Sequence, residues 1–278
     1  MAYQFILYDK ESGAAIITIN RPQVLNAWHG RTKMEMISAI EDAESDPSVL
    51  GIIFTGAGRA FSAGGSKEYW GLGTERSDDK EEAPSHWLPG DEERQRWMQE
   101  VDSNRLVDVV LGCRKPTIAA INGVIVGGPL GLVCACDIRI ASDRAQLRSA
   151  FGRRGHTLNV GVSYWLPRII GMGHTLELAY TNDIWDAREM ERVGFVNRIV
   201  PHEELIPYCK DMIKRMSMTS PVLLNAIKKS VRKAYEARDI VEGRQWEGWG
   251  MRAAQSSQDA REAEQSLLEK RDPVYKGQ

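Results

Sequence analysis

The stretch that decides the fold reads Asn122-Gly123-Val124-Ile125-Val126-Gly127-Gly128-Pro129-Leu130-Gly131. It follows a strand-like run, Thr117 to Ile121, and leads into an apolar segment, Leu130 to Cys136, that we predict to be a helix. A glycine pair between a strand and a helix allows a sharp turn and leaves backbone amides accessible. Pro129 suits the first helical position, where its missing N–H would have no helical partner. Such a pair on its own could be merely a tight turn.

A second glycine pair lies upstream, in Arg59-Ala60-Phe61-Ser62-Ala63-Gly64-Gly65-Ser66. It follows a buried strand that we predict from Val49 to Thr55, and a further strand is expected from Ile138 to Ala141. A helix with one apolar face is expected from Thr32 to Glu44. Strands that alternate with helices in this way predict an α/β core.

The two ends of the chain differ in character. Near the start, Tyr3 to Tyr8 and Ala14 to Asn20 read as strands joined by a hairpin turn at Ser12-Gly13. Beyond Pro201 the chain consists mostly of helix formers, with amphipathic stretches from Glu203 to Met216 and from Val222 to Ala237. We therefore divide the chain into an α/β core, residues 1–200, and a helical C-terminal region, residues 201–278.

An acidic insertion, residues 70–93, interrupts the core and is rich in Gly, Pro, Asp and Glu. Long loops of this kind are usually functional or disordered. A lid over a pocket and a solvated insertion are equally compatible with its composition.

Composition excludes several classes of function. The chain has 278 residues and a formal net charge of −2, which argues against broad nucleic-acid binding. No apolar run is long enough to cross a membrane, and the first residues do not resemble a signal peptide. Four cysteines and five histidines form no metal-ligand spacing, so we expect free buried thiols and no metal. A cytoplasmic location is expected.

Five stretches, taken in order, resemble the signatures of the crotonase (enoyl-CoA hydratase/isomerase) superfamily. They are Asn20-Arg21-Pro22 with Leu25-Asn26-Ala27, Lys115 to Gly123, Cys136 to Ala141, Val193 to Pro201 and Glu269 to Tyr275. The resemblance covers nearly the whole chain. It implies a spiral of repeated ββα units, with C-terminal helices that drive assembly into homotrimers or hexamers.

The resemblance also implies an acyl-CoA substrate and no cofactor beyond the CoA thioester itself. It assigns the backbone N–H groups of Gly65 and Gly128 to an oxyanion hole, which stabilises negative charge on a thioester oxygen. The expected CoA contacts are Leu25, Ala27, Ala63, Gly64 and Lys270.

The sequence departs from the family at the positions of its two catalytic glutamates. Gly131 stands at the first of them, and Phe151 stands at the second. Ordinary hydration of a double bond is therefore doubtful, because nothing aligned replaces either carboxyl group. Asn159 falls where the dehalogenase branch of the family has a nucleophilic aspartate. Gly131 and Phe151, with Asp102, are expected to line the substrate pocket.

Other side chains could supply the chemistry. His156 lies in the catalytic segment, and an imidazole is a common proton-transfer group, although a hydrogen-bonded loop histidine is an equal alternative. Arg148, Arg153 and Arg154 could clamp a substrate carboxylate, and the simpler interpretation is surface or interface charge. Trp246 and Trp249 lie in the helical tail, which in this family can reach a neighbouring subunit's site.

Three functions remain open at this stage. The first is an enzyme that stabilises a thioester enolate or oxyanion, as an isomerase, a C–C hydrolase or lyase, or an atypical hydratase. The second is a non-catalytic acyl-CoA-binding homologue. The third is a C–C hydrolase acting on a diketone that carries no CoA.

Overall fold

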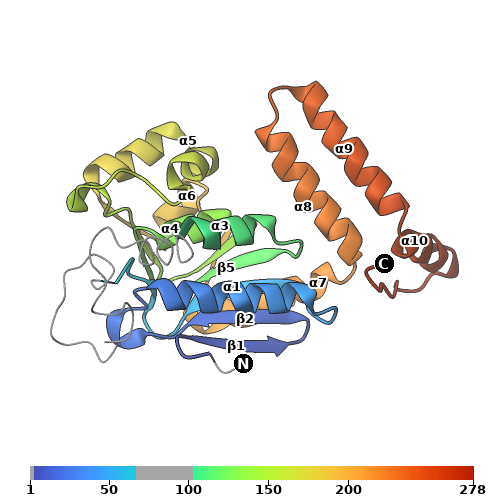
Figure 1. Ribbon diagram of the computed structural model, residues 1–278, viewed down its shortest axis with the longest axis horizontal. Helices are drawn as coiled ribbons and strands as arrows, with labels where there is room; N and C mark the ends of the chain where they lie inside the picture. Colours follow the sequence, from blue (N-terminus) through green and yellow to red (C-terminus); the bar gives the residue numbers. More distant parts are fainter. Residues whose placement is uncertain (1–2, 67–102) are drawn as a thin grey trace, which may run out of the picture.

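Pairs of strands, each followed by a helix, repeat along the core of the protein (Figure 1). The computed structural model describes residues 3–66 and 103–278. The first pair, β1 and β2, stays within one sheet, whereas in the next three pairs the first strand joins that sheet and the second strand joins another. This alternation is the ββα repeat that the sequence predicts.

Six strands form the larger sheet and four form the smaller one. In spatial order, the larger sheet holds β1 (Ile6–Glu11), β2 (Ala14–Ile19), β3 (Gly51–Gly56), β5 (Thr117–Ile121), β7 (Ile138–Ser142) and β10 (Arg198–Val200). The smaller sheet holds β4 (Ala60–Ser62), β6 (Val124–Val126), β8 (Gln146–Arg148) and β9 (Ile184–Asp186). The central pairings of both sheets are parallel. Parallel strands of this kind are covered on both faces and read as continuous apolar runs.

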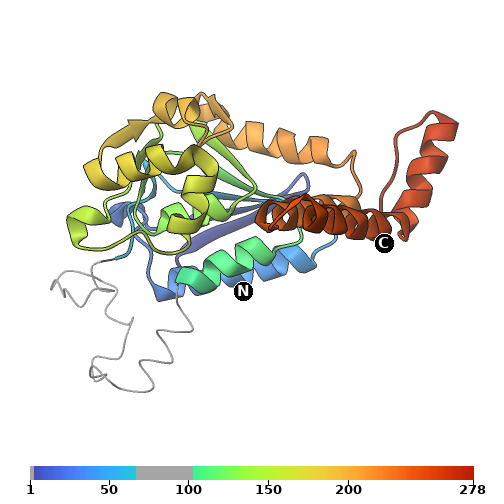
Figure 2. The same cartoon turned by 90° about the horizontal axis from the view of Figure 1, so that it is seen from above.

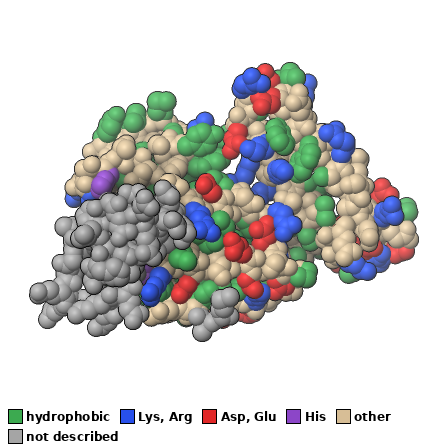
Figure 3. Space-filling view, viewed as in Figure 1, with side chains coloured by type: hydrophobic (Ala, Val, Ile, Leu, Met, Phe, Trp, Pro, Cys, Tyr) green, Lys and Arg blue, Asp and Glu red, His purple; other side chains and the backbone are tan. Residues whose placement is uncertain are grey.

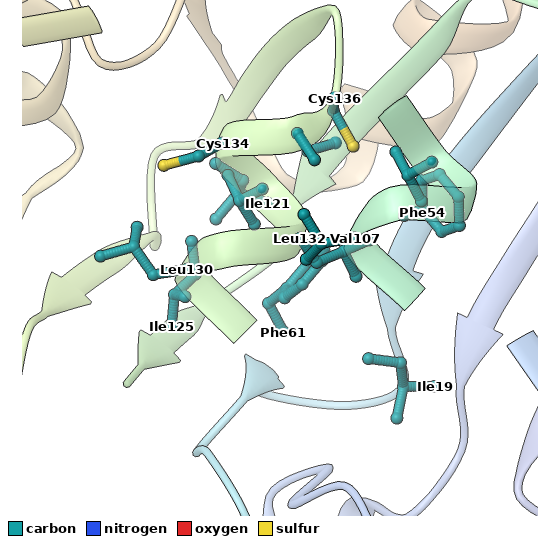
Figure 4. Packing of buried hydrophobic residues seen from close by; sticks show 14 of the residues in the cluster. Ile19, Phe54, Phe61, Val107, Ile121, Ile125, Leu130, Leu132, Cys134 and Cys136 are labelled. Carbon is teal, nitrogen blue, oxygen red and sulfur yellow. The ribbon is translucent and has the colours of Figure 1, made fainter. Parts of the chain in front are cut away.

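Helices surround the two sheets and extend beyond them. They are α1 (Gly30–Ser45), α3 (Ser103–Gly112), α4 (Pro129–Ala135), α5 (Val162–Thr181), α6 (Ala187–Arg192), α7 (Leu205–Met216), α8 (Pro221–Glu236), α9 (Ile240–Gln255) and α10 (Gln258–Glu269). Helix α4 is wholly buried, and Leu130, Leu132 and Cys134 pack with Ile121 and Phe61 in the core (Figure 4).

The N-terminal hairpin forms as predicted, but its first strand lies further along the chain. The strand predicted from Tyr3 to Tyr8 is wrong by three residues at each end, since β1 runs from Ile6 to Glu11. Ser12 and Gly13 both adopt positive φ angles, 54° and 80°, which suit a two-residue turn of the mirror-image type. Such a short turn forces Glu11 to pair with Ala14 and so fixes where the strand ends.

Helix α7 belongs to the core although it lies beyond residue 200. Its residues Leu205, Cys209 and Ile213 pack against Ile53 and Ile118 of the larger sheet. The part of the chain that projects from the core therefore starts at α8 rather than at the predicted boundary.

Helices α8 and α9 run side by side away from the core, and α10 lies beyond them (Figures 1 and 2). Asp137, just after the end of α4, anchors α8 to the core through ion pairs with Lys228 at 2.9 Å and Arg232 at 2.7 Å. Apolar side chains remain on the outside of these helices (Figure 3). In the described ranges no helix combines the length and the apolar character needed to cross a membrane.

The four cysteines are free and buried, as expected. Burial raises the pKa of Cys134, Cys136 and Cys209 to about 12, so these thiols stay protonated and unreactive. Within the described residues no group of three or more potential metal ligands comes together. The acidic insertion, residues 70–93, and Asp102 lie outside the described residues.

Candidate active site

A cavity of about 180 Å³ opens where the two glycine turns meet. It is small beside the 300–1,000 Å³ of most ligand pockets. The described residues that line it are Trp28, Gly64, Gly65, Ser103, Asn104, Gly127, Gly128, Ala150, Phe151, Arg154, His156, Asn159 and Val160. The structure thus brings together both predicted oxyanion glycines with Phe151, His156 and Asn159.

The first glycine turn is held by a short bridge to Trp28. The Trp28 amide donates to the carbonyl of Gly64 at 2.9 Å, and the Ser66 amide donates to the carbonyl of Trp28 at 2.9 Å. Gly64 has a φ of +107°, which a residue with a side chain rarely adopts. These bonds leave the intervening N–H of Gly65 directed away from the bridge and available to a ligand.

The second glycine turn ends at the start of α4. Gly127 has a φ of +67° and donates to the carbonyl of Arg148 at 3.3 Å. Gly128 caps the helix and Pro129 occupies its first turn, as the sequence predicts. Within residues 3–66 and 103–278, neither the Gly65 nor the Gly128 amide donates to another group. Two unpaired N–H groups in one cavity are what an oxyanion hole requires.

The loop that carries the predicted CoA contacts is fastened to the first glycine turn. Buried Asn26 donates to the carbonyls of Ala57 and Ala60 at 2.8 and 2.7 Å, and the Ala63 amide donates to the carbonyl of Leu25 at 2.9 Å. Leu25, Ala27, Ala63 and Gly64 consequently lie close together, and Gly64 alone of these four lines the cavity.

Lys270 lies apart from this group. It is exposed and caps the far end of α10, beyond the projecting helices (Figure 1). Lys270 is not among the described residues that line the cavity.

Comparison with known proteins places this geometry in a family. Residues 9–278 match the family described as Enoyl-CoA hydratase/isomerase. The chain belongs to the enoyl-CoA hydratase/isomerase family. It is 30% identical over 275 residues to the "Probable enoyl-CoA hydratase echA8" of Mycobacterium bovis, and this match covers 99% of each protein. It is also 30% identical to the "Crotonyl-CoA hydratase" of Syntrophomonas wolfei, over 98% of this chain and 97% of that protein.

Solved structures confirm the predicted fold class of this family member. The enoyl-CoA hydratase from Bacillus anthracis superimposes with a TM-score of 0.86 at 26% identity, covering 99% of this chain and 100% of that chain. The DspI protein of Pseudomonas aeruginosa gives a TM-score of 0.82 at 28% identity, with 98% and 96% covered.

The two positions expected to carry the family's glutamates are occupied differently here. Phe151 lines the cavity with a buried ring. Gly131, by contrast, is absent from the described lining, because Val160 covers it. A β-carbon on Gly131 would lie 2.8 Å from Cγ1 of Val160 and still closer to the Val160 carbonyl oxygen.

The backbone is strained beside this contact in the cavity. Val160 has a φ of +55° and Ala150 a φ of +52°, and both residues line the cavity. A β-branched residue in this region is an outlier that the surrounding structure must enforce. The bend at Val160 brings its carbonyl onto Gly131.

Charge in the cavity comes from one short turn, Gly152–Arg154, and the residues after it. The Phe151 carbonyl accepts from the amides of Arg154 and His156, both at 3.0 Å, and so holds both residues at the cavity. Among the described lining residues there is no Asp or Glu. His156 is therefore the titratable side chain of the described lining that is best suited to proton transfer.

Three lining residues were missed or underrated from sequence. Trp28 is 3% exposed, and its indole would lie 3.6 Å from a β-carbon on Gly128. Trp28 directly follows Leu25-Asn26-Ala27 in the sequence, and this position next to the predicted CoA-contacting loop could have indicated that it lies at the site. Asn104 and Ser103 enter from the first turn of α3, and the Ser103 hydroxyl accepts from the buried Lys33 ammonium at 3.3 Å.

Proposed function

We propose that this protein is an enzyme that binds an acyl-CoA thioester and stabilises an enolate or tetrahedral oxyanion formed from it. The observation that carries the proposal is that the amides of Gly65 and Gly128 lie in one cavity and donate to none of the described residues. Donors fixed in advance stabilise developing charge without the cost of reorienting, and each contributes roughly 3 kcal/mol. The reaction class is isomerisation, C–C hydrolysis or cleavage, or a hydration that uses other acids.

We assign proton transfer to His156, with Asn159 and Asn104 as hydrogen-bonding groups for substrate or water. An imidazole can both accept and donate a proton near neutral pH. The absence of carboxylates from the described lining supports this assignment over the usual pair of glutamates.

Exchange of substrate hydrogens with solvent tests the proposal directly. The wild-type protein is mixed in D₂O with a panel of saturated, enoyl-, aryl- and ketoacyl-CoA thioesters, and mass spectrometry follows deuterium at the α-carbon and any product. Deuterium incorporation or product formation with at least one thioester is the expected result. A panel that binds but never exchanges or reacts contradicts it.

That contrary outcome defines the second candidate, a non-catalytic acyl-CoA-binding homologue. One specific observation favours it: Val160 closes off Gly131, and an apolar ring stands at Phe151. Tight binding without turnover would establish this function.

We further propose that the chain self-associates into trimers or hexamers. Helix α8 carries an exposed apolar stripe at four-residue spacing, formed by Leu223, Ile227, Val231 and Tyr235. Residues four apart share one face of a helix, so these side chains form a continuous surface that a second copy could bury. Light scattering tests the assembly, and a monomer at micromolar concentration would rule it out.

A further inference from the structure

The three arginines of the catalytic segment occupy different surroundings. Arg154 lines the cavity, whereas neither Arg148 nor Arg153 belongs to the lining. Arg148 lies on β8, whereas Arg153 and Arg154 are both exposed in one short turn. The sequence alone does not show which of the three arginines lines the cavity, because that depends on the direction each side chain takes in the folded chain.

The guanidinium of Arg154 reaches the first glycine turn. Its Nη1 would lie 3.7 Å from a β-carbon built on Gly64, the residue before the oxyanion donor Gly65. A positive charge therefore lies beside the turn that presents the Gly65 amide.

The Arg154 side chain is exposed at the cavity and has no protein partner among the described residues. In the described part of the chain it forms no hydrogen bond or ion pair. Arg139, by contrast, donates to the carbonyls of Phe195 and Cys136, and Arg232 pairs with Asp137. With no Asp or Glu in the described lining, nothing there neutralises Arg154.

We propose that Arg154 is a specificity-determining residue that binds a carboxylate on the acyl group, so that the substrate is a short-chain dicarboxylic acid monothioester of CoA. A guanidinium offers two parallel N–H donors that match a carboxylate. The closeness of Arg154 to Gly64 favours a spacer of only a few carbons between thioester and carboxylate. This inference rests on the proposed function, since it requires the thioester to bind between Gly65 and Gly128.

Calorimetric titration of the full chain tests the proposal with three probes. Succinyl-CoA carries the carboxylate, butyryl-CoA has the same number of acyl carbons without it, and free CoA has no acyl group. The variant is Arg154→Gln, and Arg153→Gln is the matched control from the same turn. Since neither guanidinium supports the core, both variants should keep the wild-type melting temperature.

The wild-type protein should bind succinyl-CoA at least about tenfold more tightly than butyryl-CoA, the effect of one charge-assisted hydrogen bond. Arg154→Gln should abolish that preference and leave the affinity for butyryl-CoA and free CoA unchanged. Arg153→Gln should behave as the wild type.

Two results would overturn the proposal while leaving the proposed function intact. One is a wild-type protein that shows no preference for succinyl-CoA. The other is an Arg154→Gln variant that weakens all three ligands equally, which would place the guanidinium on a CoA phosphate. A wild-type protein that binds none of the three would instead contradict the proposed function itself.

Discussion

The backbone carbonyl of Val160 lies in the space that a side chain on residue 131 would have to enter. Gly131 is fully buried in α4, and Val160 takes a strained left-handed conformation to cover it. A glutamate at position 131 could therefore not reach the cavity unless the segment that contains Val160 moved away. The glycine at position 131 and the position of the Val160 segment therefore depend on each other, since a side chain at 131 would collide with Val160.

Gly131→Ala should lower the free energy of unfolding by about 1–3 kcal/mol, because the added methyl group meets backbone rather than a flexible side chain. Urea unfolding measures the change. Gly112→Ala is the control, since Gly112 is an exposed helical glycine whose β-carbon would meet nothing within 4 Å, and alanine there should be neutral or stabilising. Equal stability of the two variants would show that the Val160 segment yields easily.

Gly128→Pro should reduce kcat by about 10²–10³ while leaving the affinity for free CoA unchanged, because proline removes the N–H donor. Gly128 has a φ of −52°, which a proline ring accommodates, so the backbone should persist. Gly128→Ala is the matched control that retains the N–H, and its β-carbon meets Trp28 at ordinary van der Waals distance, 3.6 Å. Comparable losses in both variants would mean that shape matters at this position and the amide does not.

His156→Gln should slow α-hydrogen exchange by about 10²–10⁴, the usual contribution of a positioned general base. The substitution keeps a hydrogen-bonding side chain at the cavity and removes its ability to titrate. His174→Gln, on the outer surface of α5, should exchange at the wild-type rate. Full activity in His156→Gln would remove this histidine from the mechanism.

Asp137→Asn should cost about 3 kcal/mol of stability, because it leaves the positive charges of Lys228 and Arg232 without a compensating carboxylate. Burial alone would raise the pKa of Asp137, but these two cations outweigh it and hold the pKa below its ordinary value. The stabilisation is thus complete above the unfolded-state pKa of about 4 and is lost as the pH falls through the lower folded-state pKa.

The gap in unfolding free energy between wild type and Asp137→Asn should therefore be constant near neutrality and close below about pH 4. Asp211→Asn is the control, since its pair with Arg215 lies on the surface of α7 and should matter by less than about 0.5 kcal/mol. A gap that persists undiminished in acid would show that Asp137 acts through its hydrogen bonds to Thr117 rather than through its charge.

The sequence by itself determined the elements and the two turns. Strand, turn and helix follow one another at Thr117, Gly128 and Pro129 because each depends on local backbone preferences and on the period of apolar residues. The paired glycine turns also carried the resemblance to the family, and with it the fold. Phe151, His156 and Asn159 share one continuous segment, and all three line the cavity, while their roles stay predictions.

Only the tertiary structure decided what surrounds those turns. It separated Arg154 from Arg153, set Val160 over Gly131, brought Trp28 beside Gly128 and joined α7 to the core. Each of these facts depends on contacts between segments distant in sequence, and no local propensity encodes such contacts. Packing in three dimensions selects one direction for each side chain, and that direction determines whether a residue belongs to the site.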